Sequence, residues 1–316
     1  MPSPVKVLYI AGAGRTGSTL LEKMLGQLDG VFAGGELTFM WEYALRGRCS
    51  CGRDLVDCPV WRSIFATAYG GFDGVDAAEL VRLRRRCDSR TLPLLAIRPA
   101  RRRLLDRLGP FPATVERLYR AISSVTGCRV IVDSSKEPHY AWLLRNRTDL
   151  DVRVLHLVRD PRAVAYSWSK RREQAGIPGT LMEQRSSAVS ATYYAVSNAA
   201  AELLLASANY RRVRYEDAIA DPLAFGRVVG ELMDESLDLS SVLPDGRSGT
   251  VHETHSAWGN PNRFETGAIT LRLDDAWRER ATPRNARVVE VLNGPFLRRY
   301  GYVPHAITHR PASGSI

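Results

Sequence analysis

The feature that most constrains this chain is a glycine-rich turn at residues 12–19, Gly-Ala-Gly-Arg-Thr-Gly-Ser-Thr. An apolar run at 5–10 precedes the turn, and a helical pattern beginning at Leu20 follows it. A strand, a tight turn and a helix start in this order present backbone N–H groups to a phosphate. We therefore expect the turn to bind an anion through Gly14, Arg15, Thr16, Gly17, Ser18 and Thr19.

Nucleoside triphosphatases have a related turn, Gly-x-x-x-x-Gly-Lys-Ser/Thr, whose lysine contacts the β and γ phosphates. Here Gly12 and Gly17 take the glycine positions, but Ser18 follows Gly17 directly and Arg15 is the cation of the loop. The turn thus predicts an anionic nucleotide and argues against hydrolysis of ATP or GTP. A P-loop kinase acting on a small molecule stays an alternative, which would require Mg²⁺ and ATP.

Five short apolar or β-branched runs predict strands, at residues 5–10, 31–33, 129–132, 152–158 and 212–215. Helical patterns separate these runs, which is typical of an α/β protein with a parallel β-sheet flanked by helices on both faces. Each run ends in polar residues, and ligands of such sheets bind at the carboxyl ends of the strands. We therefore expect these polar residues to form one site.

A second anion site is predicted where the fourth run ends. Arg159 follows that run, Pro161 suits the first turn of a helix, and Ser167 lies about two turns further on. An arginine and a hydroxyl at one helix start suit a phosphate. Two such sites imply a nucleotide that carries phosphate at both ends.

At this point the chain resembles the sulfotransferases that use 3′-phosphoadenosine 5′-phosphosulfate (PAPS) and release 3′,5′-adenosine bisphosphate (PAP). Their 5′-phosphosulfate loop looks like residues 13–21, and their 3′-phosphate motif looks like residues 157–167, with Arg159 and Ser167. The resemblance implies the P-loop-like sulfotransferase fold. It also implies transfer of a sulfuryl group to a hydroxyl of a small-molecule, carbohydrate or lipid acceptor.

Similarity to tyrosylprotein sulfotransferases and related bacterial enzymes extends to four further positions. It implies that Glu36 is the catalytic base, that Lys136 assists transfer, and that Tyr215 helps to hold the nucleotide. It also places Arg263, in the late stretch 259–267, near the 3′-phosphate. The family's cytosolic members have a loop lysine and a histidine base. This chain has Arg15 instead, so Asp133, His139 and His252 stay open as alternative bases.

Sulfuryl transfer, like phosphoryl transfer, depends on positioning and on stabilising the charge of the departing oxygen. Arg15, Lys136 and the N–H groups of Gly17 to Thr19 would stabilise that charge, and Glu36 would take the acceptor's proton. No metal is expected in this step. The resemblance does not identify the acceptor, and the oligomeric state cannot be read from the sequence.

We expect residues 1–304 to form a single sulfotransferase domain with a flexible tail at 305–316. The stretch 46–127 is predicted to be a helical insertion that shapes the acceptor site, with helices at 77–86, 101–108 and 114–125. A further helix is predicted at 181–208, and 240–270 looks like a loop. Among the aromatic residues, Trp41, Tyr43, Trp61, Trp142 and Trp168 suit either a pocket or the core.

The formal net charge is +10, and only four of the 44 basic residues are lysines. A basic surface raises the local concentration of anions, nucleic acids included. The arginine runs at 82–86 and 101–103 fit either a nucleic-acid-binding surface or a solvated helix face; without a nucleic-acid motif we favour the latter. The chain has no apolar run long enough to span a membrane and no secretory signal pattern, so we expect a cytoplasmic location.

Three of the five cysteines lie close together, at Cys49, Cys51 and Cys58. An odd number of cysteines argues against a disulfide framework in a cytosolic chain. The Cys-x-Cys-x₆-Cys spacing matches no common zinc pattern, and a fourth ligand would have to come from a distant part of the chain. Packing of a loop is therefore the favoured role, with a metal or a redox-sensitive disulfide as the alternative.

Overall fold

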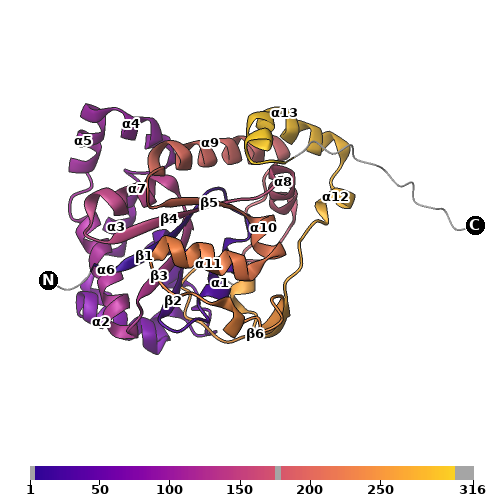
Figure 1. The fold of residues 1–316 in the computed structure, drawn as a ribbon. Helices are drawn as coiled ribbons and strands as arrows, with labels where there is room; N and C mark the ends of the chain where they lie inside the picture. Colours follow the sequence, from indigo (N-terminus) through magenta and orange to yellow (C-terminus); the bar gives the residue numbers. More distant parts are fainter. Residues whose placement is uncertain (1–3, 175–178, 303–316) are drawn as a thin grey trace, which may run out of the picture.

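A computed structural model describes residues 4–174 and 179–302, so the predicted tail at 305–316 lies outside the described residues. Its centre is a five-stranded sheet in the order β2-β3-β1-β4-β5 (Figure 1). All four neighbouring pairs are parallel, as the sequence predicted. The strands are β1 (Lys6–Ala11), β2 (Val31–Gly35), β3 (Val130–Lys136), β4 (Asp151–Val158) and β5 (Tyr210–Arg214).

Each predicted strand is present, and β3 runs four residues further than the predicted strand. Alternate residues of β1 point to opposite faces of the sheet, with Val7 and Tyr9 on one face and Leu8 and Ile10 on the other. All four are fully buried. A strand buried on both faces is the reason for the continuous apolar runs in the sequence.

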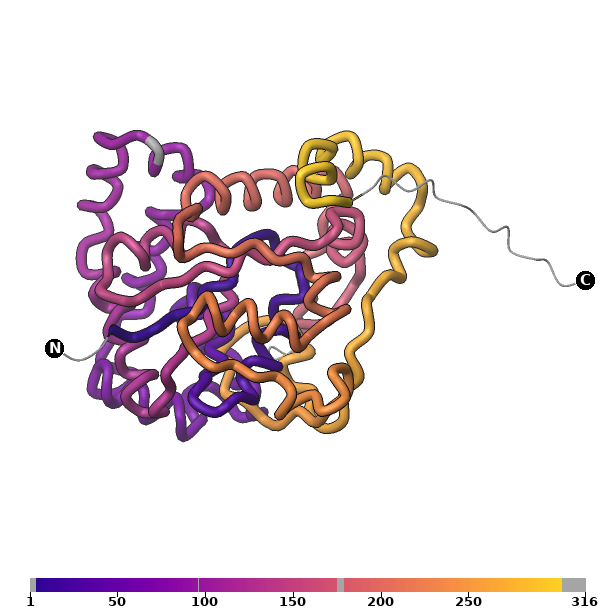
Figure 2. Tube along the Cα trace, in the orientation of Figure 1, coloured from indigo at the N-terminus to yellow at the C-terminus, as the bar shows by residue number. Residues whose placement is uncertain are grey.

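Helices cover both faces of the sheet, which confirms the predicted fold class. One face packs against α1 (Ser18–Leu25), α10 (Tyr215–Ala220) and α11 (Pro222–Met233). The other face packs against α2 (Pro59–Tyr69), α6 (Phe111–Thr126), α7 (Pro138–Arg147) and α9 (Ser187–Leu205). At one end α8 (Pro161–Ser169) and α13 (Pro283–Arg299) pack against α9 (Figures 1 and 2).

The stretch between β2 and β3 is helical, as predicted. Besides α2 and α6 it contains α3 (Ala77–Arg84), α4 (Leu92–Ala96) and α5 (Arg98–Asp106). Its large side chains extend the core: Trp61 is fully buried and Trp41 is buried, and Trp142 of α7 is buried in the same core. These three tryptophans therefore belong to the core and do not line the site.

Two expectations for the C-terminal half need correction. Helix α9 begins at Ser187, because Ser186 caps its N-terminus by accepting a hydrogen bond from the N–H of Val189; residues 181–186 are not helical. The stretch 240–270 contains an antiparallel pair, β6 (Ser248–Val251) and β7 (Gly267–Thr270). Both strands are four residues long and rich in glycine and threonine, so neither carried a period-2 apolar pattern.

The remaining helix is the short α12 (Trp277–Arg280), which packs on α8. Helix α13 is kinked at Asn293, two residues before Pro295. Within 4–174 and 179–302, no helix combines the length and the apolar character that crossing a bilayer requires.

Candidate functional site

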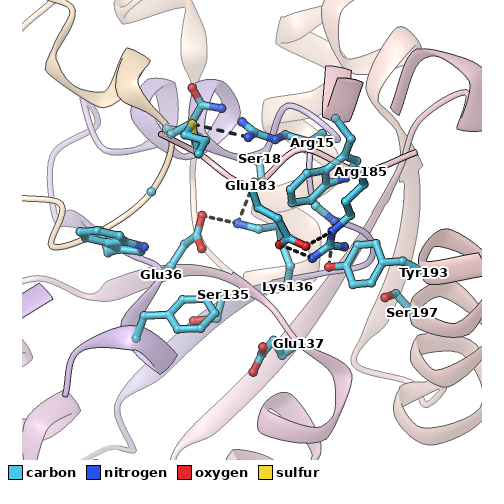
Figure 3. A pocket seen from close by; sticks show the side chains of 18 of the residues that line it. Arg15, Ser18, Glu36, Ser135, Lys136, Glu137, Glu183, Arg185, Tyr193 and Ser197 are labelled. Atoms are coloured by element: carbon cyan, nitrogen blue, oxygen red, sulfur yellow. Dashed lines mark hydrogen bonds and ion pairs between the residues drawn. The ribbon is translucent and has the colours of Figure 1, made fainter. Parts of the chain in front are cut away.

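The carboxyl ends of β1, β2 and β3 open into a cavity of about 1090 Å³. Side chains from all three strand ends and from the start of α1 line it (Figure 3). The wall on this side consists of Gly14, Arg15, Gly17, Ser18, Thr19, Glu36, Ser135 and Lys136. The convergence of polar residues that the sequence predicted is therefore present.

The glycine-rich turn owes its shape to Gly17, the N-cap of α1, whose φ of 91° favours glycine. A Cβ at this position would lie 2.3 Å from Cε2 of Tyr215, so packing excludes a side chain as well. Ser18 and Thr19 are the first residues of α1 and face the cavity. The N–H groups at a helix start lack partners within the helix and attract anions.

Lys136 and Glu36 form an ion pair in the wall of the cavity. Lys136 Nζ lies 2.7 Å from Glu36 Oε1 (Figure 3). It also donates to the carbonyl oxygen of Ser134 at 2.6 Å. The same Nζ lies 3.5 Å from Ser18 Oγ, at the start of α1. One ammonium group thus contacts both the predicted base and the predicted anion site.

The two predicted catalytic cations also have unusual backbone conformations. Among the described residues only Arg15, Lys136 and Asp234 combine a side chain with a positive φ; the values are 69° for Arg15 and 71° for Lys136. Such conformations cost about 1–3 kcal/mol and concentrate at functional sites. The Arg15 guanidinium stacks on Trp168 at 4.7 Å, and burial lowers its pKa.

Glu22 supports this arrangement from inside α1. Its buried carboxylate accepts hydrogen bonds from the N–H of Gly35 and, at 2.6 Å, from the hydroxyl of Ser134. Burial raises the pKa of Glu22 to about 8. Our sequence analysis missed this residue, although a carboxylate inside the apolar run 20–25 was a usable signal.

Arg159 lies against the outer side of the glycine-rich turn. Its Nη1 donates to the carbonyl oxygen of Arg15 at 3.3 Å, and its guanidinium stacks on the ring of Tyr215 at 4.6 Å. Its Nη2 bonds to the carbonyl oxygen of Asp274 at 2.7 Å and pairs with that carboxylate at 3.3 Å. Ser167 is buried on α8, and Pro161 begins that helix as expected.

Arg263 lies on the Glu36 side of the site. Its guanidinium donates to the carbonyl oxygens of Gly259 and Arg48, both at 2.9 Å, and burial lowers its pKa to about 10. A Cβ at Gly259 would lie 3.7 Å from Glu36 Oε1. Arg263 bonds to Gly259, and Gly259 lies next to Glu36, so Arg263 adjoins the part of the site that holds Glu36. None of its described contacts is with Arg159, the residue predicted to bind the 3′-phosphate.

Residues 8–238 match the model of the sulfotransferase family. The chain belongs to this family. Among solved structures, it is similar to the sulfotransferase domain of the curacin biosynthetic pathway, with 17% identity and a TM-score of 0.53 over 93% of this chain and 99% of that one. It is also similar to the sulfotransferase domain of the Synechococcus PCC 7002 olefin synthase, with 19% identity and a TM-score of 0.49 over 92% and 94%. No curated protein matches.

The predicted site residues of this sulfotransferase fall into two groups. Seven line the cavity: Gly14, Arg15, Gly17, Ser18, Thr19, Glu36 and Lys136. Five are buried but are not among the residues that line it: Thr16, Arg159, Ser167, Tyr215 and Arg263. Three of these five contact the turn or belong to it: Thr16 donates to the carbonyl oxygen of Ala13 at 3.1 Å, Arg159 donates to that of Arg15, and the ring of Tyr215 packs on Gly17.

The three alternative bases occupy different environments. Asp133 is fully buried and accepts hydrogen bonds from Tyr119 and Ser135, and burial raises its pKa to about 6. His139 lines the cavity and lies 3.0 Å from Glu137. His252 is exposed and stands outside the cavity lining. Glu36 and His139 are therefore the two of the four that face the cavity.

The opposite wall of the cavity holds residues that our sequence analysis did not single out. Tyr193 on α9 accepts a hydrogen bond from the N–H of Gly14 at 3.2 Å, and Arg185 stacks on Trp168 at 4.0 Å. Val189, Tyr193 and Val196 share one face of α9, and their spacing of three to four residues was a signal. Trp258 also lines the cavity, but it lies in a loop without a periodic pattern, so no sequence signal pointed to it.

The strain at Arg15 can be measured by comparing two variants. We expect Arg15→Gly to be more stable than Arg15→Ala by about 1 kcal/mol, because only alanine retains the left-handed penalty. At Arg102, an exposed position in α5, the glycine variant should instead be less stable than the alanine variant. Urea unfolding measures both differences. Equal stability of the two Arg15 variants would show that the turn holds no strain.

Burial of Glu22 predicts a pH-dependent stability. The folded protein retains the Glu22 proton up to about pH 8, whereas the ordinary pKa is 4.5. The native state then binds more protons within this window, so the free energy of unfolding falls as pH rises through it. We expect Glu22→Gln to reduce that slope between pH 5 and 8, and Glu231→Gln, an exposed control on α11, to leave it unchanged. An unaltered slope in Glu22→Gln would contradict the assignment.

Proposed function

We propose that this sulfotransferase transfers a sulfuryl group from PAPS to a hydroxyl of a small-molecule, carbohydrate or lipid acceptor. The observation that carries the proposal is the contact of Lys136 with both Glu36 and Ser18 in one cavity wall. A cation, a carboxylate and a helix N-terminus at one point suit the transfer of an anionic group to a neutral oxygen nucleophile.

The donor would lie along the glycine-rich turn. Its 5′-phosphosulfate would accept hydrogen bonds from the N–H groups of Gly17 to Thr19, and its 3′-phosphate would pair with Arg159 and Ser167. In support of this, the carboxylate of Asp274 already lies 3.3 Å from the guanidinium of Arg159. A phosphate could replace this carboxylate as the partner of Arg159, because both are anionic acceptors.

Charge explains the roles of the three proposed catalytic residues. The acceptor oxygen attacks sulfur while the bond from sulfur to the bridging oxygen breaks, and the acceptor proton moves to Glu36. Negative charge builds on the departing oxygen of PAP, where Lys136 and Arg15 stabilise it. The 2.7 Å ion pair between Lys136 and Glu36 keeps the carboxylate that would accept the proton beside the cation that would stabilise the departing oxygen.

The acceptor would occupy the aromatic side of the cavity. Ring and alkyl groups form this wall, contributed by Phe39, Tyr43, Leu92, Trp168, Tyr193, Val196 and Trp258. Leu92 and Ser89 come from the stretch 46–127, which supports its proposed role in shaping the acceptor site. Such a lining favours a hydroxyl carried by a ring or an alkyl chain.

The nucleic-acid alternative has less support. In the arginine run at 82–86, Arg82 pairs with Glu79, while Arg84 and Arg85 both pair with Glu42. These cations already have carboxylate partners within the protein. Arg84 is buried, whereas Arg82, Arg85 and Arg86 are exposed, so this run is a partly neutralised surface and not an open basic patch.

Binding of PAP tests the donor. Calorimetry should show tight binding to the wild type and a loss on the order of tenfold or more in Arg159→Ala, because a charge-assisted contact is removed. Arg153→Ala, a change near the opposite end of the same strand, serves as the matched control and should bind PAP normally. Equal affinity of the wild type for ATP would overturn the donor assignment.

Turnover tests the catalytic roles. PAP release from PAPS should be measured in the presence of a panel of phenols and alkyl alcohols. We expect Lys136→Ala and Arg15→Ala each to reduce kcat on the order of a hundredfold or more. Glu36→Gln should lose turnover while retaining PAP affinity, since it removes the base but no phosphate contact. Normal turnover in Glu36→Gln would leave His139 as the better candidate.

A further inference from the structure

The three clustered cysteines meet a histidine from the other end of the chain. Cys49, Cys51 and Cys58 lie between β2 and the start of α2, and His255 lies in the loop after β6. Cys58 and His255 are 197 residues apart in sequence. Their three sulfur atoms and one imidazole nitrogen all lie within 4.8 Å of one another.

The spacing of these atoms suits a single tetrahedral ion. Zinc bonds of about 2.3 Å to sulfur and about 2.0–2.1 Å to nitrogen place a sulfur and a nitrogen ligand about 3.6 Å apart. His255 Nδ1 lies 3.4 Å from Cys58 Sγ and 3.7 Å from Cys49 Sγ. Three thiolates and one imidazole are a common ligand set for structural zinc.

One of the sulfurs lies at a helix start. Cys58 is the N-cap of α2, and the N-terminus of a helix stabilises a negative sulfur. Burial raises the pKa of the Cys49 and Cys58 thiols, so the positive charge of the ion itself would drive their deprotonation.

Hydrogen bonds hold the two halves of the cluster together. Ser50, between two of the cysteines, donates its hydroxyl to the carbonyl oxygen of Thr254 at 2.6 Å and accepts from the N–H of Ser256 at 2.8 Å. These two partners flank His255. The buried indole N–H of Trp61 donates to the carbonyl oxygen of His255 at 2.8 Å. The imidazole is therefore positioned beside the sulfurs by its own backbone contacts.

We propose that Cys49, Cys51, Cys58 and His255 bind a structural zinc ion that joins the segment before α2 to the loop that carries Trp258. The ion would take its four ligands from the protein, which leaves no open position for catalysis. None of the four is among the described residues that line the cavity. This ion would therefore take no part in the proposed transfer step and would act on stability. This site is independent of the proposed donor and acceptor.

Metal content and thiol count test the proposal directly. We expect the purified chain to contain one zinc ion per molecule, and all five cysteines to react with a thiol reagent after denaturation. Replacement of zinc by Co²⁺ should give the visible bands of a tetrahedral thiolate site. Removal of the metal by a chelator should lower Tm, and Zn²⁺ alone should restore it.

Variants separate the site from general packing. Cys58→Ser and His255→Ala should each weaken zinc binding on the order of a hundredfold or more, measured by competition with a chromogenic chelator. His255→Cys should retain zinc, because it restores a fourth soft ligand. Cys87→Ser and Cys128→Ser, at buried cysteines outside the cluster, should bind zinc as the wild type does.

Two results would overturn the proposal. One is a chain that binds neither Zn²⁺ nor Co²⁺ while all its thiols are free, which would make the cluster simple packing. The other is a loss of two free thiols, which would assign a disulfide instead. Both are read on the wild type, so the proposal is testable even where a variant fails to fold.

Discussion

The site depends on the hydrogen bonds that the buried carboxyl group of Glu22 accepts. This group joins α1 to the N–H of Gly35 at the end of β2 and to the hydroxyl of Ser134 near the end of β3. Gly35 precedes Glu36, and Ser134 lies two residues before Lys136. One acceptor group inside the first helix thus holds the segments that carry Glu36 and Lys136 close to the N-terminus of that helix, where the predicted anion site lies.

Strain and hydrogen bonding balance each other in this arrangement. Lys136 ends its strand in a left-handed conformation, yet its carbonyl oxygen accepts a hydrogen bond from the N–H of Gly12, and its ammonium has three oxygen neighbours. Each left-handed residue costs about 1–3 kcal/mol. The contacts that Lys136 makes in this conformation offset that cost and hold its ammonium in the cavity wall.

Local sequence signals predicted the parts of the site that follow directly from strand ends. The turn at 12–19, Glu36, Lys136 and Arg159 each come after an apolar run, and the register of a parallel sheet brings such ends together. The partners of these residues were not predictable in the same way. Asp274 and Trp258 reach the site, and His255 reaches the cysteine cluster, through loops with no periodic pattern. The two four-residue strands β6 and β7 had no alternating apolar pattern either.

The loop after β6, which carries Trp258, provides hydrogen-bond partners for the edge of the central sheet. Strand β2 is an edge strand, and an exposed edge requires partners for its backbone groups. The segment around Trp258 supplies them: Ala257 N–H donates to the Gly34 carbonyl oxygen, and Glu36 N–H donates to that of Trp258, both at 3.0 Å. The backbone N–H of Glu36, the proposed base, is therefore held by a segment that begins at the cysteine and histidine cluster. The proposed zinc ion would fix His255 at that cluster and so shorten the part of the loop that is free to move. A shorter free segment limits how far Trp258 and Glu36 can move apart.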